Sequence, residues 1–203
     1  MEPAEILKEI AHQVAICTHC QLHFSRKLAV PGEGPENAEI MFIGEAPGYN
    51  EDQQGRPFVG QAGQFLNELL ASIGLKRQDV YITNIIKTRP PGNRDPLPVE
   101  IANCKGWLDA QLEIIRPKMI VTLGRYSMAR FFPGKSISQI HGTSVQKDGV
   151  LYFAMYHPAA ALHQQSLRET IMKDMQKIPV LLAKTKESPQ EAPQPEIKQL
   201  HLF

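Results

Sequence analysis

The sequence lacks the features of a membrane or secreted protein. No apolar run approaches the roughly 20 residues that a membrane-spanning helix needs. Residues 1–16 have neither the basic start nor the apolar centre of a secretory signal, which predicts a cytoplasmic protein without a membrane partner. Cysteines are also scarce. The chain has three, and a small odd number favours metal or cluster ligation over a disulfide framework.

Neither sign of charge is in excess. The 22 lysines and arginines nearly balance the 21 aspartates and glutamates. No global positive field therefore draws nucleic acid to this protein, and any contact with DNA must come from local patches and loops. The length of 203 residues suits one domain with a large core.

Apolar runs and helical periodicity alternate along the chain. Short apolar runs predict strands at residues 38–44, 79–86, 118–123 and 149–156. Helical spacing predicts helices at residues 5–14, 62–73, 99–115, 125–132 and 166–183. This order predicts an α/β fold, a three-layer α/β/α sandwich around a central, mostly parallel four-stranded sheet.

Unusual polar residues stand where the predicted strands end. Glu45 follows the first strand, Asn84 lies near the end of the second, and His157 follows the last. In open α/β sheets, ligands bind beyond the carboxyl ends of the strands. We therefore expect these three side chains, which are far apart in the sequence, to share one site.

A glycine- and proline-rich loop over residues 45–63 separates the first strand from the next helix. Prolines restrict such a loop, and glycines let its backbone approach a ligand closely. Phe58 follows Pro57 outside any periodic element, so its ring can stack on a planar ligand or plug the core below the loop. Glu51 and Asp52 are expected to fix the loop or face solvent rather than take part in chemistry.

The chain ends on a short apolar peptide behind a polar stretch. We expect one folded domain over residues 1–184, a disordered linker over 185–198 and the peptide over 199–203. The peptide resembles the Gln-Leu-x-Leu-Phe motif with which bacterial replication and repair proteins bind the sliding clamp. The alternative is a tail that folds back onto its own domain. By the resemblance, the residues that contact the clamp are Gln199, Leu200, Leu202 and Phe203.

Five segments together resemble the iron–sulfur type of uracil-DNA glycosylase, often called family 4. They occur in the order found in that family, and the match covers most of residues 15–182. The resemblance implies the α/β/α fold and hydrolysis of the bond between uracil and deoxyribose after the base has turned out of the helix. The segments are Gly44 to Asp52, Gly55 to Gly63, Thr83 to Lys87, Arg89 to Arg94 and His157 to Ala160.

The resemblance also implies which residues bind uracil. It places the Phe58 ring against the flipped base, with Gly44 and Ala46 in the same site. The Asn84 amide is implied to accept a hydrogen bond from N3–H and to donate one to O4, a pattern that cytosine reverses at position 4. The alternative for Asn84 is a cap at the end of its strand.

Three residues are implied to take part in catalysis. His157, held by Pro158, donates a hydrogen bond to uracil O2 as negative charge develops there. Glu45 positions or deprotonates the attacking water, and Asn93 is a second candidate for holding that water. The alternative for Glu45 is that its carboxylate holds the loop through backbone amides.

Contacts with DNA are expected to be local. Phosphates are expected at backbone amides near a helix start and at three basic side chains, and one leucine is expected to fill the gap left by the flipped base. The alternative for this leucine is packing beneath its own helix. The residues are Gly60 and Gly63 for the amides, Lys87, Arg89 and Arg94 for the charges, and Leu162 for the gap.

The resemblance implies a 4Fe-4S cluster, but one ligand differs. Cys17, Cys20 and Cys104 match three of the family's four cysteines, and Thr88 stands at the fourth position. Thiolates are the usual ligands of such clusters, and a neutral hydroxyl is a poor substitute. The sequence leaves open a cluster with three cysteines that solvent, Thr88, His19 or His23 completes, a cluster that has lost an iron, no cluster, or zinc. We favour a structural cluster on at least three cysteines.

These observations predict a monomeric bacterial repair enzyme, cytoplasmic and associated with the nucleoid, that releases uracil from DNA and leaves an abasic site. Two alternatives stay open. One is a module of the same fold that binds uracil or damaged DNA with weak or no turnover. The other is a glycosylase for a different deaminated base.

Overall fold

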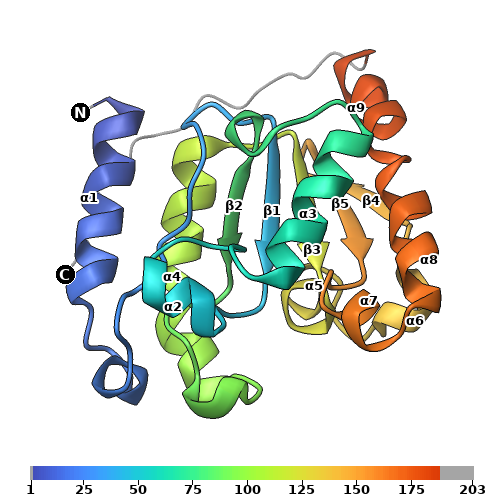
Figure 1. Cartoon of the computed structure of the whole chain (residues 1–203). Helices are drawn as coiled ribbons and strands as arrows, with labels where there is room; N and C mark the ends of the chain where they lie inside the picture. The colour runs from blue at the N-terminus through green and yellow to red at the C-terminus, as the bar shows by residue number, and fades with distance from the viewer. Residues whose placement is uncertain (1, 188–203) are drawn as a thin grey trace.

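The computed structural model describes residues 2–187 and, in the last helix, side chains as far as Thr185. A five-stranded sheet with the order β2-β1-β3-β5-β4 forms its centre (Figure 1). β2, β1, β3 and β5 are parallel, and β4 is antiparallel to β5. The strands are β1 (Ile40–Gly44), β2 (Tyr81–Asn84), β3 (Met119–Leu123), β4 (Ser144–Lys147) and β5 (Val150–Met155).

Helices connect these strands and cover both faces of the sheet. Short 3-10 turns, η1 (Gln21–Phe24), η2 (Arg77–Asp79) and η3 (Pro91–Asn93), lie in the connections. The α-helices of the described chain are α1 (Pro3–Ile16), α2 (Tyr49–Gln54), α3 (Gln61–Ser72), α4 (Pro98–Ile115), α5 (Arg125–Phe131), α6 (Ile137–Ile140), α7 (Ala160–His163), α8 (Ser166–Met175) and α9 (Ile178–Glu187).

The elements form the three layers predicted from the sequence. One face of the sheet packs against α3, α8 and α9, and the other packs against α4 and α5. α1 lies outside α4, where Ile10 and Val14 pack with Ala110 (Figure 1). The sheet is therefore buried on both sides, and its carboxyl edge is left for a site.

Each central strand divides its side chains between two cores. In β1, Phe42 belongs to the core beneath α3 and α8, whereas Met41 and Ile43 belong to the core beneath α4. Successive residues of a strand point to opposite faces, so a sheet covered on both sides needs apolar residues at every position. This explains why the strands are continuous apolar runs in the sequence.

The four predicted strands are confirmed with shorter bounds, and a fifth strand, β4, joins the edge of the sheet. All four residues of β4 are exposed, and Val145 is the apolar one among them. Pairing with β5 runs from Ser144 opposite Phe153 to Lys147 opposite Val150. An exposed edge strand of this composition carries no apolar signal, so the sequence does not reveal it.

The C-terminal helical region also differs from the prediction. The helix expected at residues 166–183 is two helices, α8 and α9, and α9 continues to Glu187, past the boundary predicted near Lys184. The clamp-like peptide at 199–203 and linker residues 188–198 lie outside the described residues. Within residues 2–187, no helix is long and apolar enough to cross a membrane.

Candidate active site

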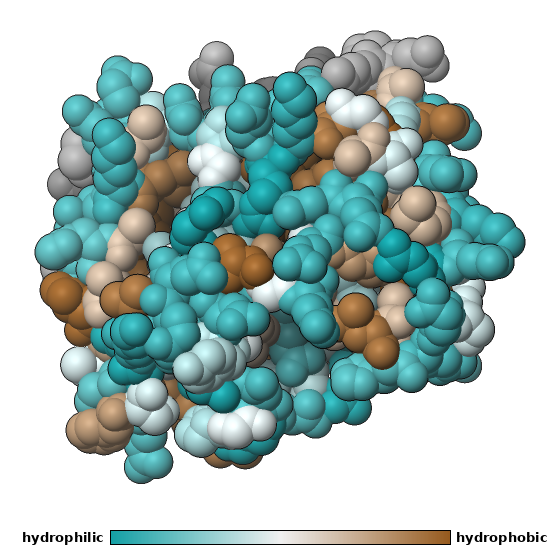
Figure 2. Space-filling view, in the orientation of Figure 1, coloured by the Kyte–Doolittle hydropathy of each residue, from teal (hydrophilic) through white to brown (hydrophobic). Residues whose placement is uncertain are grey.

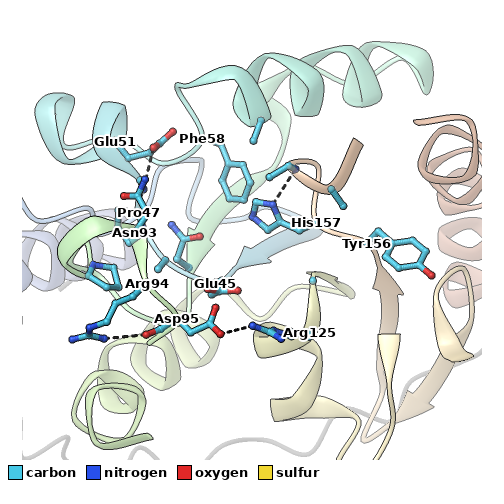
Figure 3. Close-up of a pocket in the computed structure, with 18 of the residues that line it drawn as sticks. Glu45, Pro47, Glu51, Phe58, Asn93, Arg94, Asp95, Arg125, Tyr156 and His157 are labelled. Atoms are coloured by element: carbon cyan, nitrogen blue, oxygen red, sulfur yellow. Dashed lines mark hydrogen bonds and ion pairs between the residues drawn. The ribbon is translucent and has the colours of Figure 1, made fainter. Parts of the chain in front are cut away.

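A cavity of about 720 Å³ lies at the carboxyl ends of the parallel strands. Glu45, Phe58, Asn84 and His157 all line it, although they come from four separate segments of the chain. Figure 3 shows three of them, Glu45, Phe58 and His157, around the cavity. Ala46 also lines the cavity wall. Figure 2, in the orientation of Figure 1, shows a largely hydrophilic face with scattered hydrophobic patches. The convergence expected for the residues at the strand ends is therefore present in the structure.

Phe58 reaches the cavity through an uncommon backbone conformation. Its φ is +51°, in the left-handed region that non-glycine residues rarely adopt. Arg77 stabilises this turn, since its guanidinium donates hydrogen bonds to the carbonyl oxygens of Pro57 at 2.6 Å and Phe58 at 3.0 Å and pairs with Glu33. The Phe58 ring is buried and also lines the cavity, so core packing and ligand stacking are compatible roles.

Gly63 fits the structure as a packing residue. It is buried, and a Cβ built there would overlap the Phe58 carbonyl. The first turn of α3 can therefore approach the loop only because residue 63 has no side chain. This placement explains the glycine without the phosphate contact predicted from the sequence.

Asn84 presents a buried acceptor that has no partner among the described residues. Its Oδ1 atom is buried and makes no hydrogen bond within the described part of the chain. A Cβ at Gly44 would lie 2.6 Å from Phe58 Cζ and still closer to Asn84 Oδ1. Glycine at the end of β1 is thus what lets the amide and the ring meet. A buried amide oxygen without a partner does not fit a strand-end cap, and it indicates a bound donor.

His157 lies against the Phe58 ring, with the two ring centroids 5.5 Å apart. The backbone N–H of Ala159 donates to His157 Nδ1 at 3.1 Å (Figure 3). Burial lowers the pKa of His157 to about 4, so the ring is neutral at physiological pH. Because Nδ1 accepts a hydrogen bond, the proton of the neutral ring is on Nε2, which makes that atom a donor.

Glu45 is half-buried at the wall of the same cavity. Burial, and next the negative charge of Asp95, raise the pKa of Glu45 to about 6, while Arg125 opposes this shift. The amides of the loop are bound by Glu51 instead of Glu45, as described next. The loop-holding alternative for Glu45 is therefore not supported.

Glu51 and Asp52 fix the loop, as predicted. Glu51 Oε1 accepts hydrogen bonds from the amides of Val59 at 2.8 Å and Gly60 at 2.9 Å, and its Oε2 accepts from Gly48 at 3.1 Å. Buried Asp52 accepts from the Lys27 amide at 2.9 Å. The phosphate contact predicted for the Gly60 amide does not fit this structure, because that N–H already donates to a carboxylate.

Lys87 also departs from its predicted role. Its ammonium is buried and donates to Thr83 Oγ1 at 2.6 Å, to the Asn84 carbonyl at 2.9 Å and to Gln111 Oε1 at 2.7 Å. These three acceptors use all three of its donors. Lys87 therefore joins β2 to α4 inside the protein and cannot reach a DNA phosphate in this structure.

The remaining predicted polar residues lie in the loop around η3. Arg89 Nε donates to Asn93 Oδ1 at 2.6 Å, and its guanidinium lies 5.2 Å from the centre of the exposed Tyr49 ring. Arg94 pairs with Glu100 at 2.6 Å, which ties the loop to α4. Asn93 and Arg94 line the cavity. Since Asn93 Oδ1 already accepts from Arg89, the Asn93 side chain can bind a water through its amide nitrogen.

Leu162 is exposed on α7, the short helix that follows His157. Its side chain is 45% exposed, and packing beneath the helix does not explain this leucine. An exposed leucine beside the cavity fits the predicted insertion into a DNA duplex.

The three cysteines come from neighbouring parts of the fold. Cys17 ends α1, Cys20 precedes η1, and buried Cys104 lies on α4, where Cys20 packs against the same apolar cluster. Burial raises the pKa of the Cys104 thiol, and the charges of Cys20 and Cys17 act in the same direction. Within residues 2–187, no group of three or more Cys, His or acidic side chains has the arrangement of a metal site. Three thiols and the buried Thr88 hydroxyl do not supply the donors of a four-thiolate cluster.

Several residues that line the cavity were not predicted. Arg125 follows Gly124 at the end of β3, so the strand-end argument applied to that strand would have found it. Asp95 lies in the proline-rich loop and has no comparable signal. Tyr156 and His163 flank the predicted His157 motif and also line the wall.

Comparison with known proteins gives the family. Residues 31–178 match the uracil DNA glycosylase superfamily. A type-4 uracil-DNA glycosylase of Archaeoglobus fulgidus is 48% identical over 89% of this chain and 95% of its own length. Those of Sulfurisphaera tokodaii and Thermotoga maritima are 47% and 43% identical over 85% of this chain and over 83% and 93% of their own lengths. The chain therefore belongs to the uracil DNA glycosylase superfamily and, within it, to the type-4 family.

Gly44→Ala tests the close packing at the end of β1. The added methyl group would displace the Phe58 ring and the Asn84 amide, and we expect uracil release from an oligonucleotide to fall by about 100-fold. Gly106→Ala, which adds a methyl group in open space on α4, is the matched control and should keep its activity. Full activity of Gly44→Ala would show that the contact does not shape the site.

Proposed function

We propose that this glycosylase excises uracil from DNA by holding the flipped base between Phe58, Asn84 and His157. The observation that carries the proposal is the buried Asn84 Oδ1 atom, which has no partner among the described residues. Leaving such an atom unpaired costs about 1–3 kcal/mol, and a bound N–H donor would recover that free energy. The N3–H group of uracil is such a donor.

The Asn84 amide also accounts for selectivity. Its oxygen accepts from uracil N3–H, and its nitrogen donates to O4. Cytosine carries an amine at position 4 and no hydrogen on N3, so both bonds would be lost. Since the amide is buried, water cannot replace them, and the discrimination follows from unpaired polar groups. Phe58 supplies the flat apolar surface on which the base stacks.

His157 stabilises the departing base. Hydrolysis breaks the C1′–N1 bond and leaves its electron pair on uracil, with negative charge at O2. The neutral His157 ring donates from Nε2 to that oxygen, in a position fixed by the Ala159 amide and the Phe58 ring. A fixed donor of this kind contributes about 3–4 kcal/mol to stabilisation of the transition state.

Glu45 acts on the water. With a pKa of about 6, it is a carboxylate at pH 7 and above and can orient the water and accept its proton as the oxygen bonds to C1′. Its charge also favours the cationic character that develops on the sugar. Asn93, which also lines the cavity, is the second residue that holds this water.

DNA contacts use the surface around the cavity. Leu162 enters the stack from α7 as the base leaves it. Arg89 and Arg94 provide positive charge in the loop beside η3. This set is smaller than the sequence predicts because Lys87 and Gly60 are bound within the protein.

The cofactor that we propose is an iron–sulfur cluster on Cys17, Cys20 and Cys104, with Thr88 at the fourth position. Its proposed role is structural, because it would join the end of α1 to α4 and would take no part in breaking the glycosidic bond. The support is the sequence pattern, the packing of Cys20 and Cys104 in one apolar cluster, and the electrostatic effect of Cys20 and Cys17 on the Cys104 thiol. An incomplete donor set predicts incomplete iron loading.

Thr88→Cys tests the cofactor proposal. A complete cluster holds about four irons per chain. We expect the unmodified chain, purified without oxygen, to contain iron and sulfide but fewer irons than this, and we expect the iron content of Thr88→Cys to approach it. Thr143→Cys, which adds a thiol on an exposed loop, should leave the iron content unchanged. Absence of iron and sulfide from both the unmodified chain and Thr88→Cys would contradict the proposal.

We also propose that residues 199–203 bind the sliding clamp and bring the enzyme, as a monomer, to newly replicated DNA in the bacterial nucleoid. The support is the sequence of the peptide alone. Deleting residues 199–203 should leave uracil release from short oligonucleotides unchanged and abolish pull-down by the clamp. Loss of uracil release would instead assign the peptide to the folded domain.

Asn84→Asp tests recognition of the base. A carboxylate keeps an acceptor for N3–H but loses the donor to O4, so we expect the ratio of uracil to cytosine excision to fall by about ten-fold or more. Asn37→Asp, an exposed substitution that precedes β1, is the control and should keep the ratio. An unchanged ratio in Asn84→Asp would remove Asn84 from recognition.

A further inference from the structure

An ion pair that the proposed chemistry does not use joins two walls of the cavity. Asp95, in the loop after η3, pairs with Arg125, the first residue of α5 (Figure 3). Both side chains line the cavity and are more than half exposed. The pair connects the loop that carries Asn93 to the segment that follows β3.

Tyr126 supports this pair from the protein side. The Arg125 guanidinium lies 4.8 Å from the centre of the Tyr126 ring. Hydrogen bonds from the Tyr126 hydroxyl and from Arg125 hold the pKa of Asp95 below its usual range. Asp95 therefore stays negative and Arg125 positive throughout the pH range in which the enzyme works, so the pair presents two constant charges to the cavity.

The two charges act on Glu45 in opposite directions. Asp95 raises the pKa of Glu45, and Arg125 lowers it, on top of the larger effect of burial. Figure 3 shows the Glu45 carboxylate near this pair, on the side of the cavity away from Phe58. The charges of Asp95 and Arg125 therefore offer a means of adjusting the pKa of Glu45, the proposed general base.

Other charged or titratable groups also face the cavity. Arg94 is paired with Glu100, the Glu51 carboxylate is bound by loop amides, and His157 is neutral above pH 4. Tyr126 keeps its proton, since burial raises the pKa of its hydroxyl. Tyr156 and His163 also line the cavity wall. Among the described residues, the two charged side chains that shift the pKa of Glu45 are Asp95 and Arg125.

We propose that Asp95 and Arg125 are positioning residues for Glu45, and that the balance of their two charges sets the pH at which the Glu45 carboxylate becomes available to the attacking water. The proposal rests on the role of Glu45 in the proposed function. It assigns opposite effects to the two members of one ion pair, which a purely structural role would not produce.

The sign of each effect follows from electrostatics. A carboxylate base is lost as the pH falls through its pKa, so kcat/KM should fall below about pH 6 in the unmodified enzyme. Asp95→Asn removes a negative neighbour, lowers the pKa of Glu45 and moves this fall to lower pH. Arg125→Met removes a positive neighbour, raises the pKa and moves the fall to higher pH.

The experiment measures kcat/KM for uracil release against pH in the full-length chain. Because both charges are exposed, we expect displacements of a few tenths of a pH unit in opposite directions, and smaller ones at high salt. Glu39→Gln and Lys118→Met are matched controls. Glu39 precedes β1 and Lys118 precedes β3, and the two form a partly exposed ion pair at the end of the sheet opposite the cavity. Neither substitution should shift the pH dependence of kcat/KM.

A second measurement separates this inference from the catalytic role of Glu45. The side-chain carboxyl carbons of ¹³C-labelled glutamates are titrated by NMR, with Glu45→Gln to assign the signal. Opposite displacements of the Glu45 midpoint in Asp95→Asn and Arg125→Met support the inference. If these occur while the rate profile stays fixed, the catalytic role proposed for Glu45 is wrong. No displacement, or displacement in the same direction, overturns the positioning role.

Discussion

At the end of β1, Gly44 leaves room for two side chains that could not otherwise meet. The Phe58 ring and the Asn84 amide approach so closely that a single methyl group at position 44 would collide with both. The amide is buried there, and its oxygen has no hydrogen-bond partner among residues 2–187. Arg77 and Gly63 complete the arrangement by holding Phe58 in its left-handed turn. A site that recognises a planar base therefore depends on close backbone packing as much as on the polar groups.

Burial in one cavity moves the pKa values of two titratable groups in the directions that the proposed mechanism needs. It raises the pKa of Glu45 to about 6 and lowers that of His157 to about 4. At neutral pH the cavity therefore holds a carboxylate and an uncharged imidazole with its proton on the outer nitrogen. In the proposed mechanism, a neutral donor stabilises the departing uracil anion without forming an ion pair with the carboxylate that acts on water. The two groups can work side by side because neither neutralises the other.

The sequence was sufficient to predict the layered fold and the four central residues of the cavity. Buried parallel strands are continuous apolar runs, and the polar residues just beyond them mark the functional edge of the sheet. It could not reveal β4, whose exposed residues carry no apolar pattern. Nor could it show that Lys87 and the Gly60 amide are bound within the protein, because composition does not tell whether a polar group meets protein or ligand. The sequence could not reveal the role of Asp95 either, because its electrostatic effect on Glu45 depends on how close the two side chains lie in the fold.

The central claim is that the buried Asn84 Oδ1 atom, the Phe58 ring and His157 Nε2 all contact the same pyrimidine. The most direct measurement is a crystal structure of this chain with free uracil bound. We predict the base stacked on Phe58, with its N3 within hydrogen-bonding distance of Asn84 Oδ1 and its O2 facing His157 Nε2. Uracil bound elsewhere, or an Asn84 Oδ1 atom that remains without a partner in the complex, would contradict the account.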